Sequence, residues 1–258
     1  MRRGENAIKT RLLKGDLQIG AFLGLGGTAA TEIAGQAGFD WCLIDGEHAP
    51  FGVSDIRDQL VGLAAVGCPA VVRVPCDEDW VLKRVLDIGA QTILVPMVNN
   101  AAQAASIAAA VRYPPGGRRG LAAAIVRASH YGAQPDYAQT ADDQICLIVQ
   151  AESSAAVDNI DAIAATEGVD CVFIGPSDLA ADMGHLGQSG APEVAEAIEH
   201  LITRTIAAGK AAGIFCLDPA QLGHYRDLGA RFIAVGSDVA ALRGALSETA
   251  ATAQARLA

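Results

Sequence analysis

Eight short apolar runs recur along the whole chain, and no other feature of the sequence restricts the possible folds as strongly. They begin at Leu17, Trp41, Ala70, Thr92, Ile145, Cys171, Ala211 and Arg231. Each run is continuous rather than alternating, which is typical of strands buried on both faces of a parallel sheet. The 258 residues are 51% hydrophobic and 19% charged, so the chain has enough apolar side chains for one large core.

Ala-rich segments with helical spacing separate the runs, and their ends carry helix signals. Glycines that predict helix C-termini are Gly38, Gly67, Gly89, Gly168, Gly209 and Gly229. Helix starts are predicted at Asp77, Ser153, Pro192 and Asp218-Pro219. Eight strand and helix units predict a (β/α)8 TIM barrel, an α/β fold, as a single domain over residues 1–258. An open doubly wound sheet is the alternative, but it usually has fewer strands and a Gly-rich loop after the first.

Two segments stand out from this regular pattern. Residues 113–144 form a long connection after the fourth predicted strand, and their aromatic, basic and Gly residues suggest a lid or a subunit contact. Residues 238–258 predict a C-terminal helix with Val239, Leu242 and Leu246 on one face. That spacing fits packing within the chain or against another subunit equally well.

Charge and composition exclude several classes of protein. The net charge of −10 excludes nucleic-acid binding through a basic face. No apolar run reaches the roughly 18 residues of a membrane span, and the N-terminus shows no secretory signal. The six cysteines, without a CxxC pair, predict reduced thiols in a cytoplasmic protein.

Polar residues at the carboxyl ends of the predicted strands are the candidates for an active site, because barrel enzymes place their sites there. Glu152 and Asp178 follow neighbouring strands, which lie about 4.8 Å apart, so their carboxylates could share a divalent cation. A helix cap or an ion pair for each carboxylate is the alternative. Asp218 and Asp238 also follow strands, and helix capping explains them sufficiently.

Two basic side chains follow or interrupt the second and third predicted strands. Arg73 lies within the apolar run VVRVP, where burial of its charge is costly without an anionic ligand or an ion pair with a nearby carboxylate. His48 lies in DGEHAP, where Asp45 or Glu47 could orient its ring for proton transfer.

Several segments together resemble a known family. They are AGFDWCLIDGEHAPF (37–51), VVRVP (71–75), LDIGAQTILVPMV (86–98), RYPPGGRRG (112–120), QAES (150–153) and VFIGPSDLAADMG (172–184). They are similar to the metal-dependent class II pyruvate aldolases, in particular to the 4-hydroxy-2-oxoheptanedioate aldolases of the citrate lyase and phosphoenolpyruvate/pyruvate barrel superfamily. The resemblance begins near Leu17 and covers most of the chain.

The resemblance implies an aldolase that reversibly cleaves 4-hydroxy-2-oxoacids to pyruvate, or a close 2-oxoacid, and an aldehyde through a metal-stabilised enolate. It implies that Glu152 and Asp178 bind Mg²⁺ or Mn²⁺, with Co²⁺ or Zn²⁺ as alternatives. Arg73 corresponds to the residue that contacts the keto oxygen, and His48 to the base. Further implied site residues are Asp45 and Asp87 beside the base, Gln150 near a metal-bound water, and the backbone of Ser177 and Asp178 at the pyruvate carboxylate.

The sequence departs from the family pattern on the aldehyde side of the implied pocket. Phe22 stands where the closest group has Trp, and FCLDPAQ, which includes Leu217, replaces a polar loop. Both are expected to contact substrate, so the identity of the aldehyde stays open. The resemblance also implies a homo-oligomer, a trimer or a hexamer, in which residues 238–258 are exchanged between subunits.

A Schiff-base mechanism is the chemical alternative to a metal ion, since a lysine imine also stabilises an enolate. The four lysines are Lys9, Lys14, Lys83 and Lys210, and none follows a strand at the catalytic end. An acyl-CoA lyase of the same superfamily and a non-catalytic barrel that binds 2-oxoacids remain as alternative functions.

Overall fold

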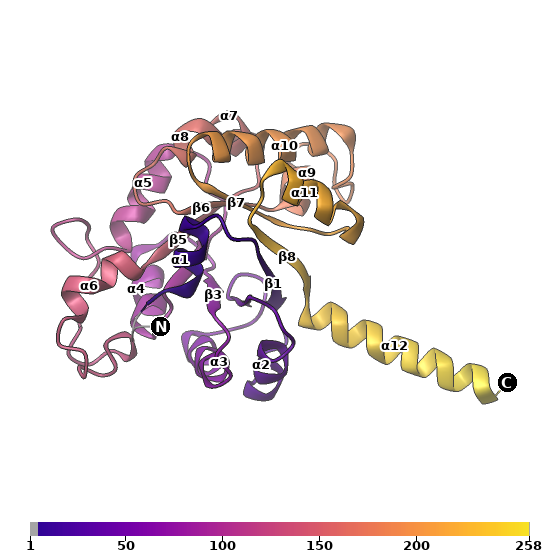
Figure 1. The fold of residues 1–258 in the computed structure, drawn as a ribbon, viewed down its shortest axis with the longest axis horizontal. Coiled ribbons are helices and arrows are strands. Elements are labelled where there is room, and N and C mark those ends of the chain that lie inside the picture. Colours follow the sequence, from indigo (N-terminus) through magenta and orange to yellow (C-terminus); the bar gives the residue numbers. More distant parts are fainter. Residues whose placement is uncertain (1–4, 258) are drawn as a thin grey trace.

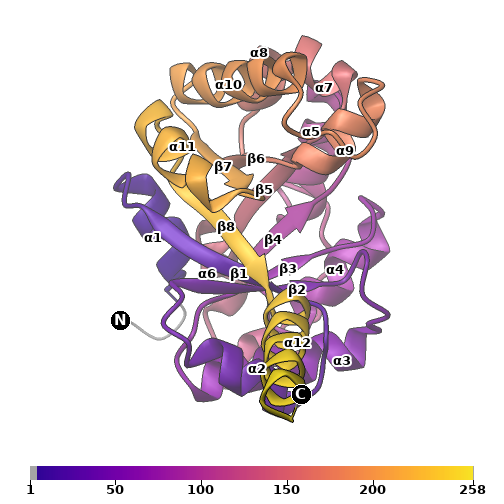
Figure 2. The same ribbon diagram turned by 90° about the vertical axis from the view of Figure 1, so that its right-hand side faces the viewer.

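The computed structural model describes residues 5–257 and shows a closed barrel of eight parallel strands in sequential order (Figures 1 and 2). The strands are β1 (Gln18–Leu23), β2 (Trp41–Asp45), β3 (Ala70–Arg73), β4 (Thr92–Val95), β5 (Cys146–Ala151), β6 (Cys171–Ile174), β7 (Ala211–Phe215) and β8 (Phe232–Ser237). Every neighbouring pair, including β1 with β8, is parallel. The predicted TIM barrel is confirmed.

Helices separate the strands, as the sequence predicts, and one further helix lies before β1 and another after β8. They are α1 (Ala7–Leu13), α2 (Thr28–Gly35), α3 (Val53–Ala65), α4 (Asp79–Asp87), α5 (Ala101–Ala110), α6 (Tyr137–Gln144), α7 (Ser154–Asp158), α8 (Ile160–Ala164), α9 (Pro176–Asp182), α10 (Pro192–Ala207), α11 (Leu222–Leu228) and α12 (Asp238–Leu257). Two short 3₁₀ helices are η1 (Arg127–Ser129) and η2 (Pro219–Gln221). All six glycines predicted to end helices have positive φ.

The predicted helix starts hold with one exception. The Ser153 and Asp218 side chains accept hydrogen bonds from Ala156 N and Ala220 N, as N-caps do. The prediction for Asp77 is wrong, because α4 begins one residue later, with Glu78 at the N-cap position. Asp77 instead accepts a hydrogen bond from Gln103 Nε2.

The barrel interior is filled by large aromatic side chains. Trp41 stacks on Phe232 with ring centroids 4.1 Å apart, and Phe173 meets Phe232 edge-on. Gly20 faces this stack, and a Cβ atom at Gly20 would lie only 2.1 Å from the Trp41 ring. The strand residues on the outer side pack against the helices in a separate, larger cluster of Val, Ile, Leu and Ala. The barrel is therefore solid, and a site must lie at one of its ends.

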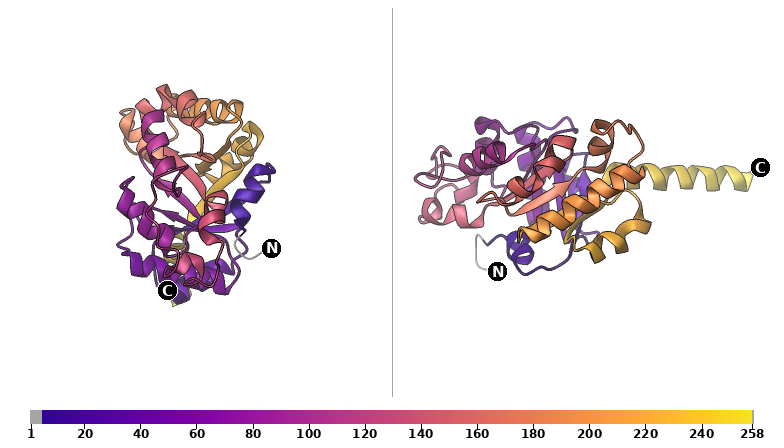
Figure 3. Two further views of the ribbon diagram at one scale, coloured as in Figure 1. Left: turned by 90° about the vertical axis from the view of Figure 1, so that its left-hand side faces the viewer. Right: turned by 90° about the horizontal axis from the view of Figure 1, so that it is seen from above.

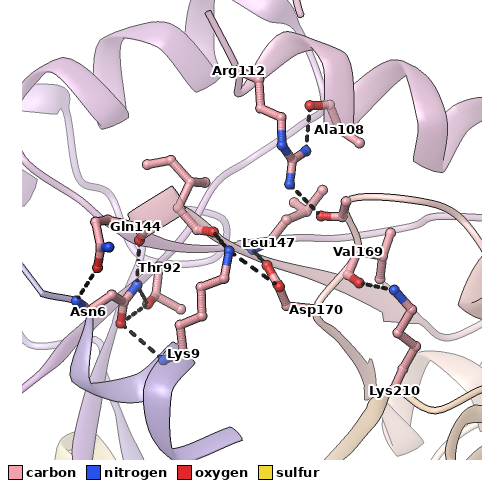
Figure 4. Close-up of polar contacts among 12 residues, drawn as sticks. Asn6, Lys9, Thr92, Ala108, Arg112, Gln144, Leu147, Val169, Asp170 and Lys210 are labelled. Atoms are coloured by element: carbon pink, nitrogen blue, oxygen red, sulfur yellow. Dashed lines mark hydrogen bonds and ion pairs between the residues drawn. The ribbon is translucent and has the colours of Figure 1, made fainter. Parts of the chain in front are cut away.

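A network of hydrogen bonds closes the amino end of the barrel (Figure 4). The Asn6 side chain caps α1 and donates to Thr92 Oγ1 and to the Gln144 carbonyl oxygen. Lys9 Nζ donates to the Ile145 carbonyl oxygen at 2.7 Å and pairs with Asp170 at 3.5 Å. Helix α1 is thereby tied to the starts of the strands.

The long connection 113–144 is not wholly irregular, since it contains η1 and ends in α6. Arg119 holds it to α4, because its fully buried guanidinium pairs with Asp87 at 2.8 Å and lies over the Tyr113 ring at 4.5 Å. Leu121 and Ile125 are exposed on this segment. Whether it acts as a lid or a subunit contact stays a prediction.

All six cysteines are free, as predicted. Among the helices of residues 5–257, none combines the length and the apolar character needed to cross a membrane.

Helix α12 leaves the barrel after β8 and projects away from it (Figures 1 and 3). None of its described side chains is buried, and Val239, Leu242 and Leu246 are each about half exposed or more. Asp238 at its start accepts hydrogen bonds from Gly24 N and Leu25 N, so it also joins α12 to the loop after β1.

Candidate active site

Arg73 is the centre of the polar cluster at the carboxyl end of the barrel. It ends β3 beside Asp45, its register partner at the end of β2. Arg73 Nε and Nη2 donate to the two Asp45 oxygens at 2.9 and 2.7 Å, and Nη1 pairs with Glu47 Oε2 at 2.9 Å. The ion pair that the sequence left as an alternative is therefore present, and each guanidinium nitrogen faces a carboxylate.

An aromatic ring from β1 covers the same guanidinium. The Arg73 Cζ atom lies 5.1 Å from the centroid of the Phe22 ring, which is close enough for a cation–π contact. Phe22 in turn meets Phe215 edge-on at 4.9 Å. Phe22 is only 7% exposed, so its main contacts are with the arginine and the interior.

The loop after β2 carries Glu47 and His48 over the barrel end. Asp45 Oδ1 accepts hydrogen bonds from the backbone N–H groups of Glu47 and His48, which fixes the turn of the chain there. His48 Nε2 lies 3.8 Å from Glu47 Oε2, and its side chain is 64% exposed. The exposed imidazole is open to a substrate, while the carboxylate beneath it is mostly covered.

Glu152 lies directly after β5 and is almost completely buried. Its Oε1 atom accepts a hydrogen bond from Met97 N at 2.8 Å, and its Oε2 atom accepts a short one from Gln150 Nε2. Met97 has a φ of 56°, an uncommon conformation for a residue other than glycine, and its N–H is thereby directed at the carboxylate. Gln150 Oε1 is buried and has no hydrogen-bond partner.

Asp178 lies in the first turn of α9, after the neighbouring strand β6. Gly175 lies between the end of β6 and α9, and a Cβ atom there would come within 2.5 Å of Glu152 Oε2 and 3.0 Å of Gln150 Nε2. The absence of that atom leaves room beside the Glu152 carboxylate. Ser177 and Asp178 are exposed, in the turn whose N–H groups lack intrahelical partners.

The charges at this end are unbalanced. Burial raises the pKa of Glu152, and the charges of Asp178 and Glu47 add to the rise. Burial also raises the pKa of Glu47, although Arg73 and His48 oppose it. Burial acts on Asp45 in the same direction, but hydrogen bonds and charge from Arg73 outweigh it and lower the pKa of this carboxyl. Two of these four carboxylates pair with Arg73, and Glu152 and Asp178 form no ion pair within the described residues.

A divalent cation fits this donor set. Two carboxylates from neighbouring strands, space beside Glu152 and an unpartnered amide oxygen on Gln150 are what an oxygen-preferring ion with bound waters requires. Within residues 5–257 no cluster of three or more His, Cys, Asp or Glu side chains could enclose a metal ion. An ion held by the two carboxylates of Glu152 and Asp178 would keep several coordination positions for water or substrate.

Of two further residues that the resemblance implies for the site, Asp87 lies elsewhere in this chain and Leu217 lies at the site end. Asp87 ends α4, only a few residues before β4 begins, and so lies toward the amino end of the barrel, where it pairs with Arg119. The chain therefore does not bring Asp87 to its own His48. Leu217 follows β7 at the carboxyl end, with its side chain half exposed.

The structure adds residues to which the sequence assigned no role. Met97 and Gly175 act through backbone geometry, which only their φ angle and missing Cβ reveal. Glu47 was visible in the DGEHAP motif, but its contact with Arg73 was not. A hollow of about 490 Å³ between α1 and residues 127–144 is at the amino end and is separate from these groups.

The fold and these side chains define a barrel enzyme with an acidic active site, and comparisons identify the family. The model of the HpcH/HpaI aldolase/citrate lyase family matches residues 18–245. A hydroxypyruvate/pyruvate aldolase from Roseovarius nubinhibens is 50% identical over 246 residues, which cover 95% of this chain and 96% of the relative. A 5-keto-4-deoxy-D-glucarate aldolase from Salmonella paratyphi A is 45% identical over 247 residues and 96% of each chain.

A solved structure agrees with these sequence comparisons. The crystal structure of an HpcH/HpaI aldolase/citrate lyase family protein from Burkholderia cenocepacia J2315 matches with a TM-score of 0.93 and 42% identity, over 96% of this chain and 99% of that one. The chain belongs to the HpcH/HpaI aldolase/citrate lyase family. The resemblance to aldolases is confirmed, and the chain is a carbon–carbon lyase.

Proposed function

We propose that this enzyme is a metal-dependent aldolase that reversibly cleaves 4-hydroxy-2-oxoacids to pyruvate, or a close 2-oxoacid, and an aldehyde. The observation that carries the proposal is the excess of carboxylates around one buried guanidinium at the carboxyl end of the barrel. A divalent ion at Glu152 and Asp178 would reduce this excess and, when bound, supply a Lewis acid for charge that develops on the substrate.

The cleavage needs a base and a site for negative charge, and the chain offers both. His48, exposed at the barrel end, takes the proton from the C4 hydroxyl group, and the C3–C4 bond then breaks to release the aldehyde. The electron pair of that bond forms the enolate, whose C2 oxygen faces the N–H groups of Arg73 that Asp45 and Glu47 leave free. Protonation at C3 completes the formation of pyruvate.

The remaining residues hold the reacting groups in place. Asp45 orients Arg73 through two hydrogen bonds, and Gln150 fixes the Glu152 carboxylate while its Oε1 atom stays available to a bound water. The backbone of Ser177 and Asp178 faces the substrate carboxylate from the start of α9. Phe22 and Leu217 border the aldehyde side.

The test is an assay with purified enzyme stripped of metal by a chelator. Pyruvate and a panel of aldehydes, hydroxylated ones included, are offered with and without Mg²⁺ or Mn²⁺, and aldol product is measured. We expect product only with added ion. Full activity after exhaustive chelation would refute the metal dependence, and binding of pyruvate without exchange of its C3 protons would favour a non-catalytic barrel.

We propose further that the enzyme is a homo-oligomer, a trimer or a hexamer, in which α12 packs against a second copy. A helix of 20 residues with no buried side chain gains little from its own barrel, and Val239, Leu242 and Leu246 offer apolar surface to a partner. Light scattering should give a multiple of 26.5 kDa for the full chain. A variant that lacks residues 238–258 should form an assembly of fewer subunits. A monomer at micromolar concentration would contradict this.

A further inference from the structure

Glu47 joins the two functional groups of the proposed site through one oxygen atom. Its Oε2 atom lies 2.9 Å from Arg73 Nη1 and 3.8 Å from His48 Nε2. That oxygen is buried and, although it forms an ion pair with Nη1, it accepts no hydrogen bond from a described residue, while the His48 side chain is exposed. One oxygen atom thus lies near both the proposed base and the proposed oxyanion donor.

The two hydrogen bonds that Arg73 donates to Asp45 do not involve its Nη1 atom. The two Asp45 oxygens hold the edge formed by Nε and Nη2, and Phe22 covers one face. The guanidinium could still tilt about that edge, which would displace Nη1 most. Glu47 is the group that faces Nη1, so the three contacts together leave the guanidinium a single orientation.

The backbone places Glu47 for this contact. Gly46 N donates to the Arg73 carbonyl oxygen at 2.8 Å, and a Cβ atom on Gly46 would lie 2.6 Å from that same oxygen. Asp45 Oδ1 accepts from the N–H groups of Glu47 and His48. The loop is thereby anchored to the end of β3, and the two methylene groups of Glu47 span the distance to Nη1.

From this geometry we infer that Glu47 is a positioning residue of the aldolase. It holds the Arg73 guanidinium in the orientation that receives the developing oxyanion, and it keeps the base His48 beside the same atoms. The inference deepens the proposed function and rests on it. Its effect should appear in kcat rather than in KM, because the charge that Arg73 receives grows along the reaction.

The kinetic test is a double-mutant cycle with Glu47→Gln and Arg73→Lys. Glu47→Gln keeps size and one acceptor oxygen but removes the charge, so kcat should fall about 10-fold to 100-fold while KM for the 4-hydroxy-2-oxoacid changes little. In the Arg73→Lys background the same change should cost less than about threefold, because the group that Glu47 orients is gone. Glu47→Asp, which keeps the charge on a shorter side chain, should fall between wild type and Glu47→Gln.

The matched control is Asp161→Asn, which removes one carboxylate from an exposed pair with Arg204 on the outer surface. It loses the same formal charge and should retain wild-type kcat. Equal losses from Glu47→Gln in both backgrounds, or a wild-type kcat for Glu47→Gln, would overturn the inference.

A second measurement does not depend on turnover. Nitrogen-15 NMR of arginine side chains reports rotation about the Cζ–Nη bonds, and the Arg73 signals are those that Arg73→Lys removes. Wild type should show slow rotation at both Nη atoms, and Glu47→Gln should show fast rotation at Nη1 alone. Unchanged rotation in Glu47→Gln would end the positioning role, even if the aldolase assay had already failed and refuted the proposed function itself.

Discussion

Charged side chains lie at both ends of the barrel, but at the amino end Lys9, Lys210 and Arg112 each have a carboxylate or carbonyl partner. There Lys9 faces Asp170, and its ammonium also donates to a carbonyl oxygen, while Asp170 accepts from Leu147 N. Lys210 and Arg112 likewise donate to carbonyl oxygens (Figure 4). At the carboxyl end, Asp45 and Glu47 pair with Arg73, whereas Glu152 and Asp178 form no ion pair with a described residue.

This difference indicates that the amino end contributes to stability and the carboxyl end to ligand binding. Satisfied hydrogen bonds and paired charges stabilise the folded state, and they fasten α1 over the starts of the strands. Unpaired carboxylates cost stability and are retained where a ligand can neutralise them. Two of the four lysines, Lys9 and Lys210, lie at the amino end with their amines donating to carbonyl oxygens.

The largest loss of turnover is expected on substitution of Glu152 or Asp178, the two carboxylates without a basic partner. Glu152→Ala or Asp178→Ala should reduce turnover at least about 1000-fold, because the proposed ion and its Lewis acid chemistry are lost together. The melting temperature of metal-free Asp178→Ala should stay near that of wild type, since Asp178 is exposed and forms no ion pair within the described residues, whereas Glu152→Ala should melt lower because Met97 N and Gln150 Nε2 lose their buried acceptor. Isothermal titration with Mn²⁺ should show binding to wild type only, and a variant that binds Mn²⁺ normally would refute the assignment.

Arg73→Ala should have the next largest effect. We expect kcat to fall at least about 100-fold, the scale of one lost oxyanion donor, and Arg73→Lys to be impaired because it lacks the planar fork. Arg204→Ala breaks a surface pair with Asp161 and is the control, with kcat unchanged. Melting temperature and kcat are measured on the same preparation. An unstable variant with full kcat in its folded fraction would reduce Arg73 to a structural ion pair.

Asp45→Asn should affect both stability and activity. The change breaks a buried ion pair, so the free energy of unfolding at neutral pH should fall by about 3 kcal/mol. Because Arg73 is then less well oriented, kcat should fall by about 10-fold. Because the pKa of Asp45 is lowered in the folded protein, its contribution is complete above the ordinary aspartate range, near pH 4, and is lost as pH falls through the lower folded value.

Urea unfolding of wild type and Asp45→Asn over a pH series measures this directly. The gap in unfolding free energy should be constant from neutral pH to about pH 4 and should close below it. A gap that persists undiminished in strong acid would mean that the pair contributes through packing rather than charge.

The sequence predicted the barrel well because its signals are local. Continuous apolar runs mark the strands, and glycines such as Gly89 mark helix ends whatever the rest of the chain does. Arg73 beside Asp45 was foreseeable from adjacent strand ends. Met97 was not, because the direction of its N–H depends on a single φ angle in a loop.

Asp87 differs, because a match to a family motif does not show where in the barrel the residue lies, and its role beside the base stays a prediction. A residue at the end of a helix lies at the end of the barrel where the next strand begins, and α4 brings Asp87 to Arg119 there. The pattern of one chain could not show that partner, since Arg119 belongs to the long connection 113–144. Tertiary contacts between irregular segments are the part that local signals do not encode.

Asn6→Ala should have the smallest effect on catalysis and so completes the comparison of the two ends. The change removes the cap of α1 and leaves Thr92 Oγ1 and the Gln144 carbonyl oxygen without their shared donor. Loss of a cap and of buried hydrogen bonds should together cost about 2 kcal/mol, which lowers the melting temperature by about 4–8 °C. The catalytic groups lie at the other end, so kcat should stay within about twofold of wild type. The melting temperature and kcat of Asn6→Ala are measured on one preparation. A large loss of kcat without a lower melting temperature would contradict the prediction and show that the two ends are coupled.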